Sequence, residues 1–217
     1  MPEFPLNNKL SGNVVDLCPV GALGDKDFLY KQRVWFLKRR EGVCTRCATG
    51  CSIWIEENQD RIYRIKPREN PHVNKWWICN DGRYDYPHVH SPRRIVQPRR
   101  RQGDSTEAAD WTALARELNE RFAAVAEKGR LAAVLSPMLS VEEAWMLGRW
   151  IRRLDENAAL ALGPVPVVGE DETYPGGFTI AAEKCPNRRG VEEVLAHFTG
   201  KVTSFEELLG QVDRGEI

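Results

Sequence analysis

Four cysteines are spaced as the ligands of one metal site. The chain reads CTRCATGC and later WWIC, which is C-x2-C-x3-C-x27-C and comprises Cys44, Cys47, Cys51 and Cys79. The first three thiols lie close enough in one loop to occupy three corners of a site, and the fourth must return from a distance. Four thiolates suit either a tetrahedral zinc ion or a cubane iron–sulfur cluster.

The spacing favours a [4Fe-4S] cluster over zinc. Zinc sites built from two knuckles usually carry a paired C-x2-C at each end, whereas here the fourth cysteine stands alone. Zinc remains the first alternative and unrelated free thiols the second. The apolar residues next to the cysteines would either exclude water from a cluster or form ordinary core, and they are Ile53, Trp54, Ile55, Trp76, Trp77 and Ile78.

A further cysteine, Cys18, stands before a proline in SGNVVDLCPVGAL, residues 11–23. A Cys-Pro step closes many iron–sulfur ligand runs. A cluster needs about four thiolates, yet no cysteine precedes Cys18 and the next is Cys44. Cys18 alone therefore cannot hold a cluster. Cys185 also precedes a proline but has no neighbour at ligand spacing, so we expect a structural role for it.

Composition excludes several classes of protein. The 217 residues include 31 basic and 31 acidic side chains, so zero net charge implies no general attraction to nucleic acid or anionic lipid. No stretch approaches the roughly 18 apolar residues of a membrane span, and MPEFPLNN does not resemble a signal peptide. We expect a soluble chain made in a reducing compartment, where clustered cysteines indicate metal more often than disulfides.

A β-hairpin is expected to bring the fourth cysteine back to the other three. SIWIEE and RIYRIK, residues 52–57 and 61–66, have the composition of two short strands around a polar turn. Beyond them, SPRRIVQPRRRQGDST, residues 91–106, is rich in proline and arginine, which indicates a connecting segment.

Alternating helices and strands are expected from residue 110 onward. Apolar residues recur at helical spacing between Asp110 and Gly129, and LAAVLS, residues 131–136, predicts a buried strand. Ser140 and Glu143 form a capping-box pattern before a second helix. Residues 158–168 predict the next strand, and VEEVLAHF and SFEELLG predict two short helices. Such alternation is typical of a parallel sheet covered by helices, and no nucleotide-binding glycine motif is present.

The cysteine motifs together resemble a known family. VCTRCATGCSIWIEE, NKWWICNDGRYDY and SPRRIVQPRR resemble the iron–sulfur domain that opens the molybdopterin oxidoreductase superfamily. SGNVVDLCPVGAL resembles the segment just before that domain in the G subunit of NADH-quinone oxidoreductase, respiratory complex I. The resemblance covers residues 7 to about 101, and AEKCPNRRGVEEVL, residues 182–195, is more weakly similar to the start of the molybdopterin-type domain.

The resemblance implies an α+β fold, with a small iron–sulfur domain containing short β-hairpins followed by an incomplete α/β, molybdopterin-oxidoreductase-like domain. We expect four parts: residues 1–36 as the trailing end of a ferredoxin-like cluster domain, 37–92 as the [4Fe-4S] domain, 93–106 as a basic linker, and 107–217 as a partial α/β domain. Cys44, Cys47, Cys51 and Cys79 fall on the family's four ligand positions.

The resemblance also gives Cys18 a role, as fourth ligand of a second [4Fe-4S] cluster whose other cysteines lie upstream. Since the chain has no such cysteines, we expect either that it is part of a longer subunit or that another polypeptide supplies them. The remaining alternative is that Cys18 is a plain core thiol.

The implied function is electron transfer within a respiratory NADH dehydrogenase complex, in its cytoplasmic, peripheral arm and with other subunits as partners. The chain is expected to contain no complete active site and no nucleic-acid site. Asp81 stands where many catalytic molybdenum or tungsten members have a lysine, which argues against a pterin here. The alternatives are a fragment of a molybdenum or tungsten oxidoreductase, such as formate dehydrogenase, and a zinc-stabilised interaction module without redox activity.

Overall fold

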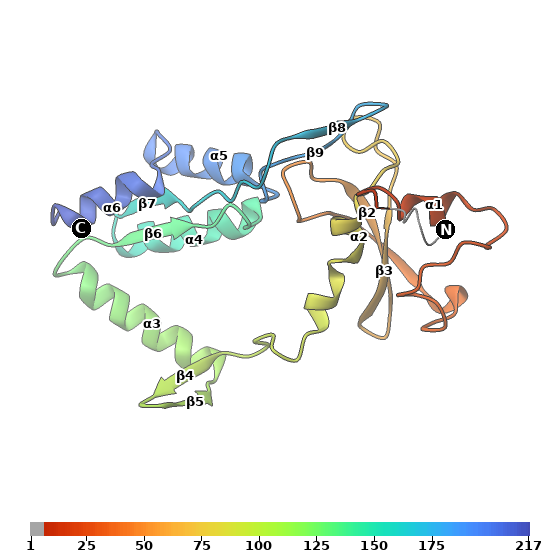
Figure 1. The fold of residues 1–217 in the computed structure, drawn as a ribbon. Helices are drawn as coiled ribbons and strands as arrows, with labels where there is room; N and C mark the ends of the chain where they lie inside the picture. Colours follow the sequence, from red (N-terminus) through yellow and green to blue (C-terminus); the bar gives the residue numbers. More distant parts are fainter. Residues whose placement is uncertain (1–6) are drawn as a thin grey trace. The chain divides into compact units, whose positions relative to one another are not determined.

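The chain forms two units, each assembled from two separate stretches of sequence. The computed structural model describes residues 7–217, so the first six residues of the predicted segment 1–36 lie outside the described range. Unit 1 contains residues up to 94 together with 166–186, and unit 2 contains residues 95–165 and 187–217. Figure 1 shows the elements of both, most of them labelled. Residues 166–186, called the return segment below, had been expected to belong to the second half.

Unit 1 is built on a three-stranded antiparallel sheet in the order β1–β2–β3. The strands are β1 (Lys38–Val43), β2 (Ser52–Asn58) and β3 (Arg61–Pro67). The turn between β2 and β3 has only two residues, Gln59 and Asp60, with φ of 51° and 58°. Two left-handed residues are what a type I′ hairpin requires, because its twist matches that of the strands. The predicted hairpin is confirmed.

Strand β1 was not predicted, because its sequence KRREGV is charged and lacks an apolar alternation. Cross-strand ion pairs hold it to β2. Arg39 Nε lies 2.7 Å from the buried carboxylate of Glu56, and Arg40 Nε lies 3.2 Å from Glu57. A charged, exposed strand at the edge of a sheet also discourages pairing with other chains.

Helices and a second hairpin complete unit 1. The return segment contributes β8 and β9, which pair antiparallel with Tyr174 opposite Phe178. Phe178 and Ile180 are buried in the same core as the cysteines and the sheet residues Ile53 and Ile65. The further elements are α1 (Asn13–Leu17), η1 (Val34–Phe36), α2 (Asn80–Tyr84), η2 (Tyr86–His90), β8 (Glu172–Tyr174) and β9 (Phe178–Ile180).

Unit 2 contains a parallel strand pair covered by helices, as the sequence predicted. Strand β6 (Ala132–Leu135) pairs in parallel with β7 (Ala159–Leu162). Their apolar core includes Leu135, Leu160 and residues of the helices, among them Ile151 and Leu195. The helices are α3 (Trp111–Ala126), α4 (Val141–Leu154), α5 (Arg188–Thr199) and α6 (Phe205–Asp213).

The predicted helix starts are confirmed by their caps. The side chain of Asp110 accepts from the Ala113 amide, and Ser204 accepts from the Glu207 amide. At α4, Ser140 and Glu143 form a complete capping box. Such caps satisfy amides that have no partner inside a helix.

Part of the stretch expected to be a linker, residues 93–106, forms a hairpin with the residues that follow it. Strand β4 (Arg99–Gln102) pairs antiparallel with β5 (Ser105–Ala108), turning at Gly103. Every residue of both strands is exposed, so the sequence has no apolar alternation from which the strands could be predicted.

The fold is therefore a mixed α+β arrangement, and this prediction is confirmed. Helices and small sheets occur in both units, with antiparallel pairing in unit 1 and one parallel pair in unit 2. Within residues 7–217, no helix has both the length and the apolar character needed to cross a membrane.

Leu135 offers a direct test of the unit 2 core, because its side chain is fully buried. Leu135→Ala should lower the free energy of unfolding by about 2–5 kcal/mol, since it removes buried apolar atoms and leaves a cavity. The neighbouring Val134, 41% exposed, provides the control: Val134→Ala should change stability by only about 0.5 kcal/mol. Equal effects of the two substitutions in urea unfolding would contradict this packing.

Candidate metal centre

Three of the predicted ligands lie in the loop between β1 and β2. Cys44 directly follows β1 and Cys51 directly precedes β2, so the paired strands fix both ends of the loop. The Cys44 amide donates to the Cys51 carbonyl at 2.8 Å. Gly50, with φ of 60°, adopts a left-handed conformation that glycine takes without strain. Cys44, Cys47 and Cys51 are all buried in this compact turn.

The fourth predicted ligand, Cys79, caps the N-terminus of α2. Its sulfur accepts a hydrogen bond from the Gly82 amide at 3.3 Å. The hairpin of β2 and β3 reverses the chain, and the loop that follows carries Cys79 back beside the β1–β2 loop. Cys44, Cys51 and Cys79 share one buried core, as the spacing predicted.

Asn74 secures this return, and sequence reasoning did not identify it. Its side chain is fully buried, accepts from the Ser52 amide at 2.9 Å and donates to the Trp77 carbonyl at 2.9 Å. The same amide nitrogen also approaches the carbonyls of Ser52 and Arg68 at 3.3 and 3.2 Å. Asn74 thereby joins the residue after Cys51 to the segment that leads into Cys79.

Burial and mutual repulsion make the free thiolates unfavourable. Burial, followed by the neighbouring sulfurs of Cys79 and Cys47, raises the pKa of Cys44 to about 11. Burial first and then Cys44 likewise raise the pKa of Cys51. The pKa of Cys79 is raised by burial, while the amide of Gly82 opposes the shift. Iron or zinc cations would remove this penalty by neutralising the converging negative charge, so the donor set fits a thiolate-bound metal group.

Gly82 allows α2 to approach the first ligand. A Cβ atom at this position would lie 2.8 Å from the Cys44 sulfur, closer than atoms normally pack. Glycine is therefore required by the close contact and not by an unusual backbone angle.

Apolar side chains cover much of the cysteine core. Ile53 and Ile78 are buried against the cysteines, and Ile55 and Trp77 pack there in part. Trp76, which had been grouped with them, is 57% exposed.

The return segment supplies covering residues that the sequence did not reveal. Phe178 is 1% and Ile180 is 6% exposed in the cysteine core. Ile180 and Lys184 also line a cavity of about 190 Å³ together with Cys47 and Cys79. Local periodicity could not indicate that residues so distant in sequence meet the cysteine loop.

A zinc ion and a cubane cluster require different arrangements of the four cysteine sulfur atoms. Among residues 7–217, no three or more His, Cys, Asp or Glu side chains converge on a point where they could hold a single metal ion. A zinc ion draws its ligands to one centre at about 2.3 Å. In a cubane, each of the four thiolates binds a different iron.

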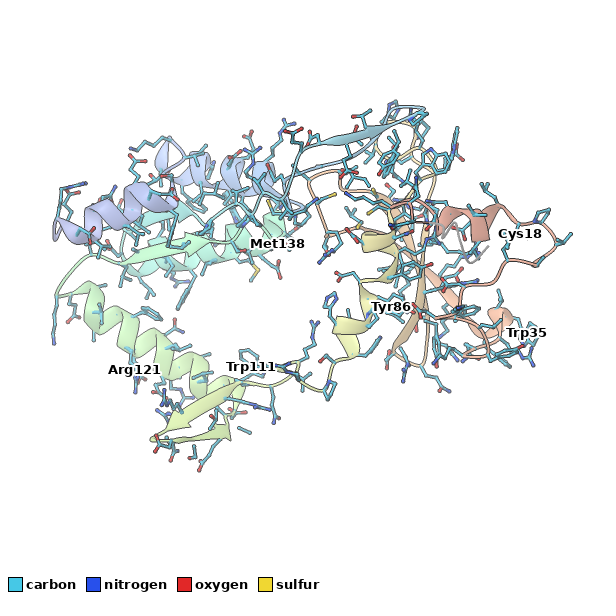
Figure 2. All side chains as sticks on the ribbon, in the orientation of Figure 1. Cys18, Trp35, Tyr86, Trp111, Arg121 and Met138 are labelled. Atoms are coloured by element: carbon cyan, nitrogen blue, oxygen red, sulfur yellow. The ribbon has the colours of Figure 1, made fainter. Side chains whose placement is uncertain are left out.

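Cys18 lies apart from the four-cysteine core. Figure 2 shows it where the chain leaves α1, and it is only partly buried. Backbone amides, first that of Leu23 and then that of Val20, lower the pKa of its thiol, while desolvation opposes them. The structure thus does not add Cys18 to the site formed by the other four.

Polar contacts nevertheless attach the Cys18 segment to the Cys79 segment. Asn13 in α1 donates to the Ile78 carbonyl at 2.8 Å and accepts from its amide at 3.2 Å. Arg83 in α2 is buried, pairs with Asp16 at 2.6 Å and donates to Asn13 at 3.1 Å. Arg83 is buried, whereas Asp16 is partly exposed, so removing Asp16 would leave a buried guanidinium without its charged partner. The contacts therefore fix Cys18 relative to α2.

Comparison with known proteins identifies the matching domain. Residues 37–91 match the family described as molybdopterin oxidoreductase Fe4S4 domain. The chain is 31% identical over 155 residues to the G subunit of NADH-quinone oxidoreductase from Rickettsia felis, an alignment covering 71% of this chain and 23% of the relative. It is 28% identical over 155 residues to the G subunit from Streptomyces coelicolor, covering 70% and 18%.

A mitochondrial protein gives a similar match. The chain is 30% identical over 153 residues to the NADH-ubiquinone oxidoreductase 78 kDa subunit of Candida albicans, covering 70% of this chain and 21% of that protein. The chain thus spans less than a quarter of the length of these relatives. The predicted resemblance to the G subunit and to the iron–sulfur domain is confirmed, and the matched domain supports an iron–sulfur cluster.

Gly82→Ala should reduce cluster binding strongly, because the added methyl group would meet the Cys44 sulfur. Alanine favours a helix by about 1 kcal/mol relative to glycine, so a loss of metal would not arise from weakening α2. Iron and acid-labile sulfide per chain measure the effect. Gly24→Ala is the control, since its Cβ would make only an ordinary 3.6 Å contact with Leu29; wild-type metal content in both variants would refute the steric account.

Cys18 should be the most readily alkylated cysteine of the metal-loaded protein. Its thiol is partly exposed and has a lowered pKa, whereas Cys185 is fully buried. Thiolate reactivity follows access and pKa. Peptide mass spectrometry after brief iodoacetamide treatment at mildly alkaline pH should find Cys18 modified well before Cys185. The reverse order would show that the Cys18 loop is not as described.

Proposed function

We propose that this chain, whose residues 37–91 belong to the molybdopterin oxidoreductase Fe4S4 domain family, binds one [4Fe-4S] cluster through Cys44, Cys47, Cys51 and Cys79 and passes single electrons. The observation that carries this proposal is the meeting of buried thiols from two distant segments in one core. A solitary buried cysteine behaves as a small apolar residue. Several together, with mutually raised pKa values, call for a cationic group.

The protein's contribution is to hold and shield that group. The paired strands β1 and β2 fix three ligands, and α2 fixes the fourth. The Gly82 amide donates to the Cys79 sulfur, and Phe178 and Ile180 exclude water on the side of the return segment. When bound, the cluster supplies one-electron redox chemistry, whose potential depends on hydrogen bonds to sulfur, burial and charge. No bond of a substrate need be made or broken by these residues.

The relatives suggest the larger setting. Proteins named as subunits of NADH-quinone oxidoreductase match this chain, and on that basis we infer that its electrons travel within a respiratory NADH dehydrogenase. Its partners would then be other subunits of that complex, in the cytoplasmic arm that lies outside the membrane. Cys18 would complete a second [4Fe-4S] cluster with three cysteines from outside the described chain.

This second role agrees with the environment of Cys18. Backbone amides of the following loop stabilise its thiolate, and hydrogen bonds to sulfur are a usual feature of iron–sulfur ligands. The contacts of Asn13 and Arg83 would hold the two clusters at a defined separation.

A molybdopterin site within this chain finds less support. Asp81, at the position where the catalytic members have lysine, is exposed and belongs to the first turn of α2. A carboxylate there would disfavour an anionic pterin cofactor beside the cluster.

Cys79→Ser tests the ligand assignment. Protein purified without oxygen should contain about four iron and four sulfide per chain, with visible absorption that bleaches reversibly on reduction. Cys79→Ser should lose most of this iron and sulfide because one of the thiolates is missing. Cys185→Ser is the matched control, since it also removes a buried thiol but one outside the ligand pattern.

Two results would contradict the proposal. About one zinc per chain without sulfide would identify a structural zinc site and a chain without redox function. Equal loss of iron in the Cys79→Ser and Cys185→Ser proteins would show that any buried cysteine is needed for folding, and not that Cys79 is a ligand.

A further inference from the structure

The return segment is joined to the cysteine loop by a network that centres on one hydroxyl group. Thr49 lies between Cys47 and Cys51, and its hydroxyl donates to the Thr179 carbonyl at 2.8 Å. The same oxygen accepts from the Ala181 amide at 3.1 Å. One residue away, the Ala48 amide donates to the Glu183 carbonyl at 2.9 Å. The loop and the return segment therefore share several hydrogen bonds along their length.

The hydroxyl of Thr49 also contacts a predicted cluster ligand. The Cys47 sulfur lies 3.4 Å from Thr49 Oγ, within hydrogen-bond distance for sulfur. With a protonated thiol, the sulfur donates to the oxygen. A thiolate bound to iron has no proton to donate, so this contact can persist as a hydrogen bond only if the hydroxyl donates to the sulfur. A threonine hydroxyl has one proton and can rotate to donate it to the sulfur in place of the Thr179 carbonyl, while its oxygen continues to accept from the Ala181 amide of the return segment.

Buried apolar side chains lie beside the network, whose threonines are themselves only partly buried. Phe178 and Ile180 flank Thr179 in β9 and are buried in the cysteine core. Burial of these side chains stabilises the contact between the return segment and the cysteine core. A hydrogen bond next to a cluster that is shielded from water lies in a low dielectric, where it is electrostatically stronger than in water. The return segment thus both shields the site and positions the hydroxyl.

We propose that Thr49 is a positioning residue, which joins the return segment to Cys47 and donates a hydrogen bond to that sulfur when the cluster is bound, thereby raising the cluster's reduction potential. The physical reason is charge. A reduced cluster carries one more negative charge than an oxidised one, so a donor to sulfur stabilises the reduced state more. This inference rests on the proposed [4Fe-4S] site and extends it to residues outside the matched family domain.

The test is a redox titration of the cluster in three variants of the whole chain. Thr49→Val keeps the shape of the side chain but removes the hydroxyl, and it should shift the midpoint potential to a more negative value. Thr49→Ser retains the hydroxyl and should restore the wild-type potential. Thr173→Val makes the same chemical change at an exposed residue of β8, where it removes a hydrogen bond to the Thr179 hydroxyl but none to the cysteine loop, and it should leave the potential unchanged.

Iron and sulfide content separates the two levels of the proposal. Absence of both from the wild-type chain would overturn the proposed function and, with it, the role of Thr49. A loaded Thr49→Val protein with the wild-type potential would overturn the role of Thr49 alone. If Thr49→Val does not retain the cluster, Thr49→Ala provides the comparison. Cluster loss in both, with retention in Thr49→Ser, would support the hydroxyl as the required group, whereas loss in Thr49→Ser as well would refute it.

Discussion

The structure of unit 1 depends on bringing four acidic sulfur atoms together in a buried space. Burial and the neighbouring sulfurs raise the pKa of the Cys44, Cys51 and Cys79 thiols. Without a cation, these three thiols therefore favour their protonated form. In the proposed cluster site, the surrounding elements hold this unfavourable set in place for a cationic group that would neutralise it.

The protein meets this constraint with strands, a helix end and a few specialised side chains. The pairing of β1 with β2 fixes a short loop with three cysteines, and the amide of Asn74 ties the returning chain to Ser52. Because Gly82 has no Cβ atom, α2 can lie close to the Cys44 sulfur. None of these features binds a metal, but each sets the position of a group that can. Their effect is geometric preorganisation, which lowers the cost of ordering ligands at the moment of binding.

Much of this architecture could be predicted from local sequence, but the covering of the site could not. Cysteine spacing and the β2–β3 alternation indicated the core of unit 1, and the pattern of Ser140 and Glu143 indicated a helix start. Strand β1 was missed because it is charged and has no apolar face; it is held by backbone pairing with β2, to which cross-strand ion pairs are added. Helix α3 was predicted by its apolar spacing, yet it has no fully buried residue. The packing of the return segment on the cysteine core was not predicted, because contact between distant segments leaves no periodic signal.

The division of unit 1 into two stretches has a consequence for how it is made. The last residue of the matched domain, 91, and the end of the return segment, 186, are 95 residues apart. At typical elongation rates, their synthesis is separated by about 5–20 s. During that interval a nascent chain presents its cysteine loop without Phe178 and Ile180. The cysteine loop is therefore open on this side until the return segment has been synthesised and packs against it.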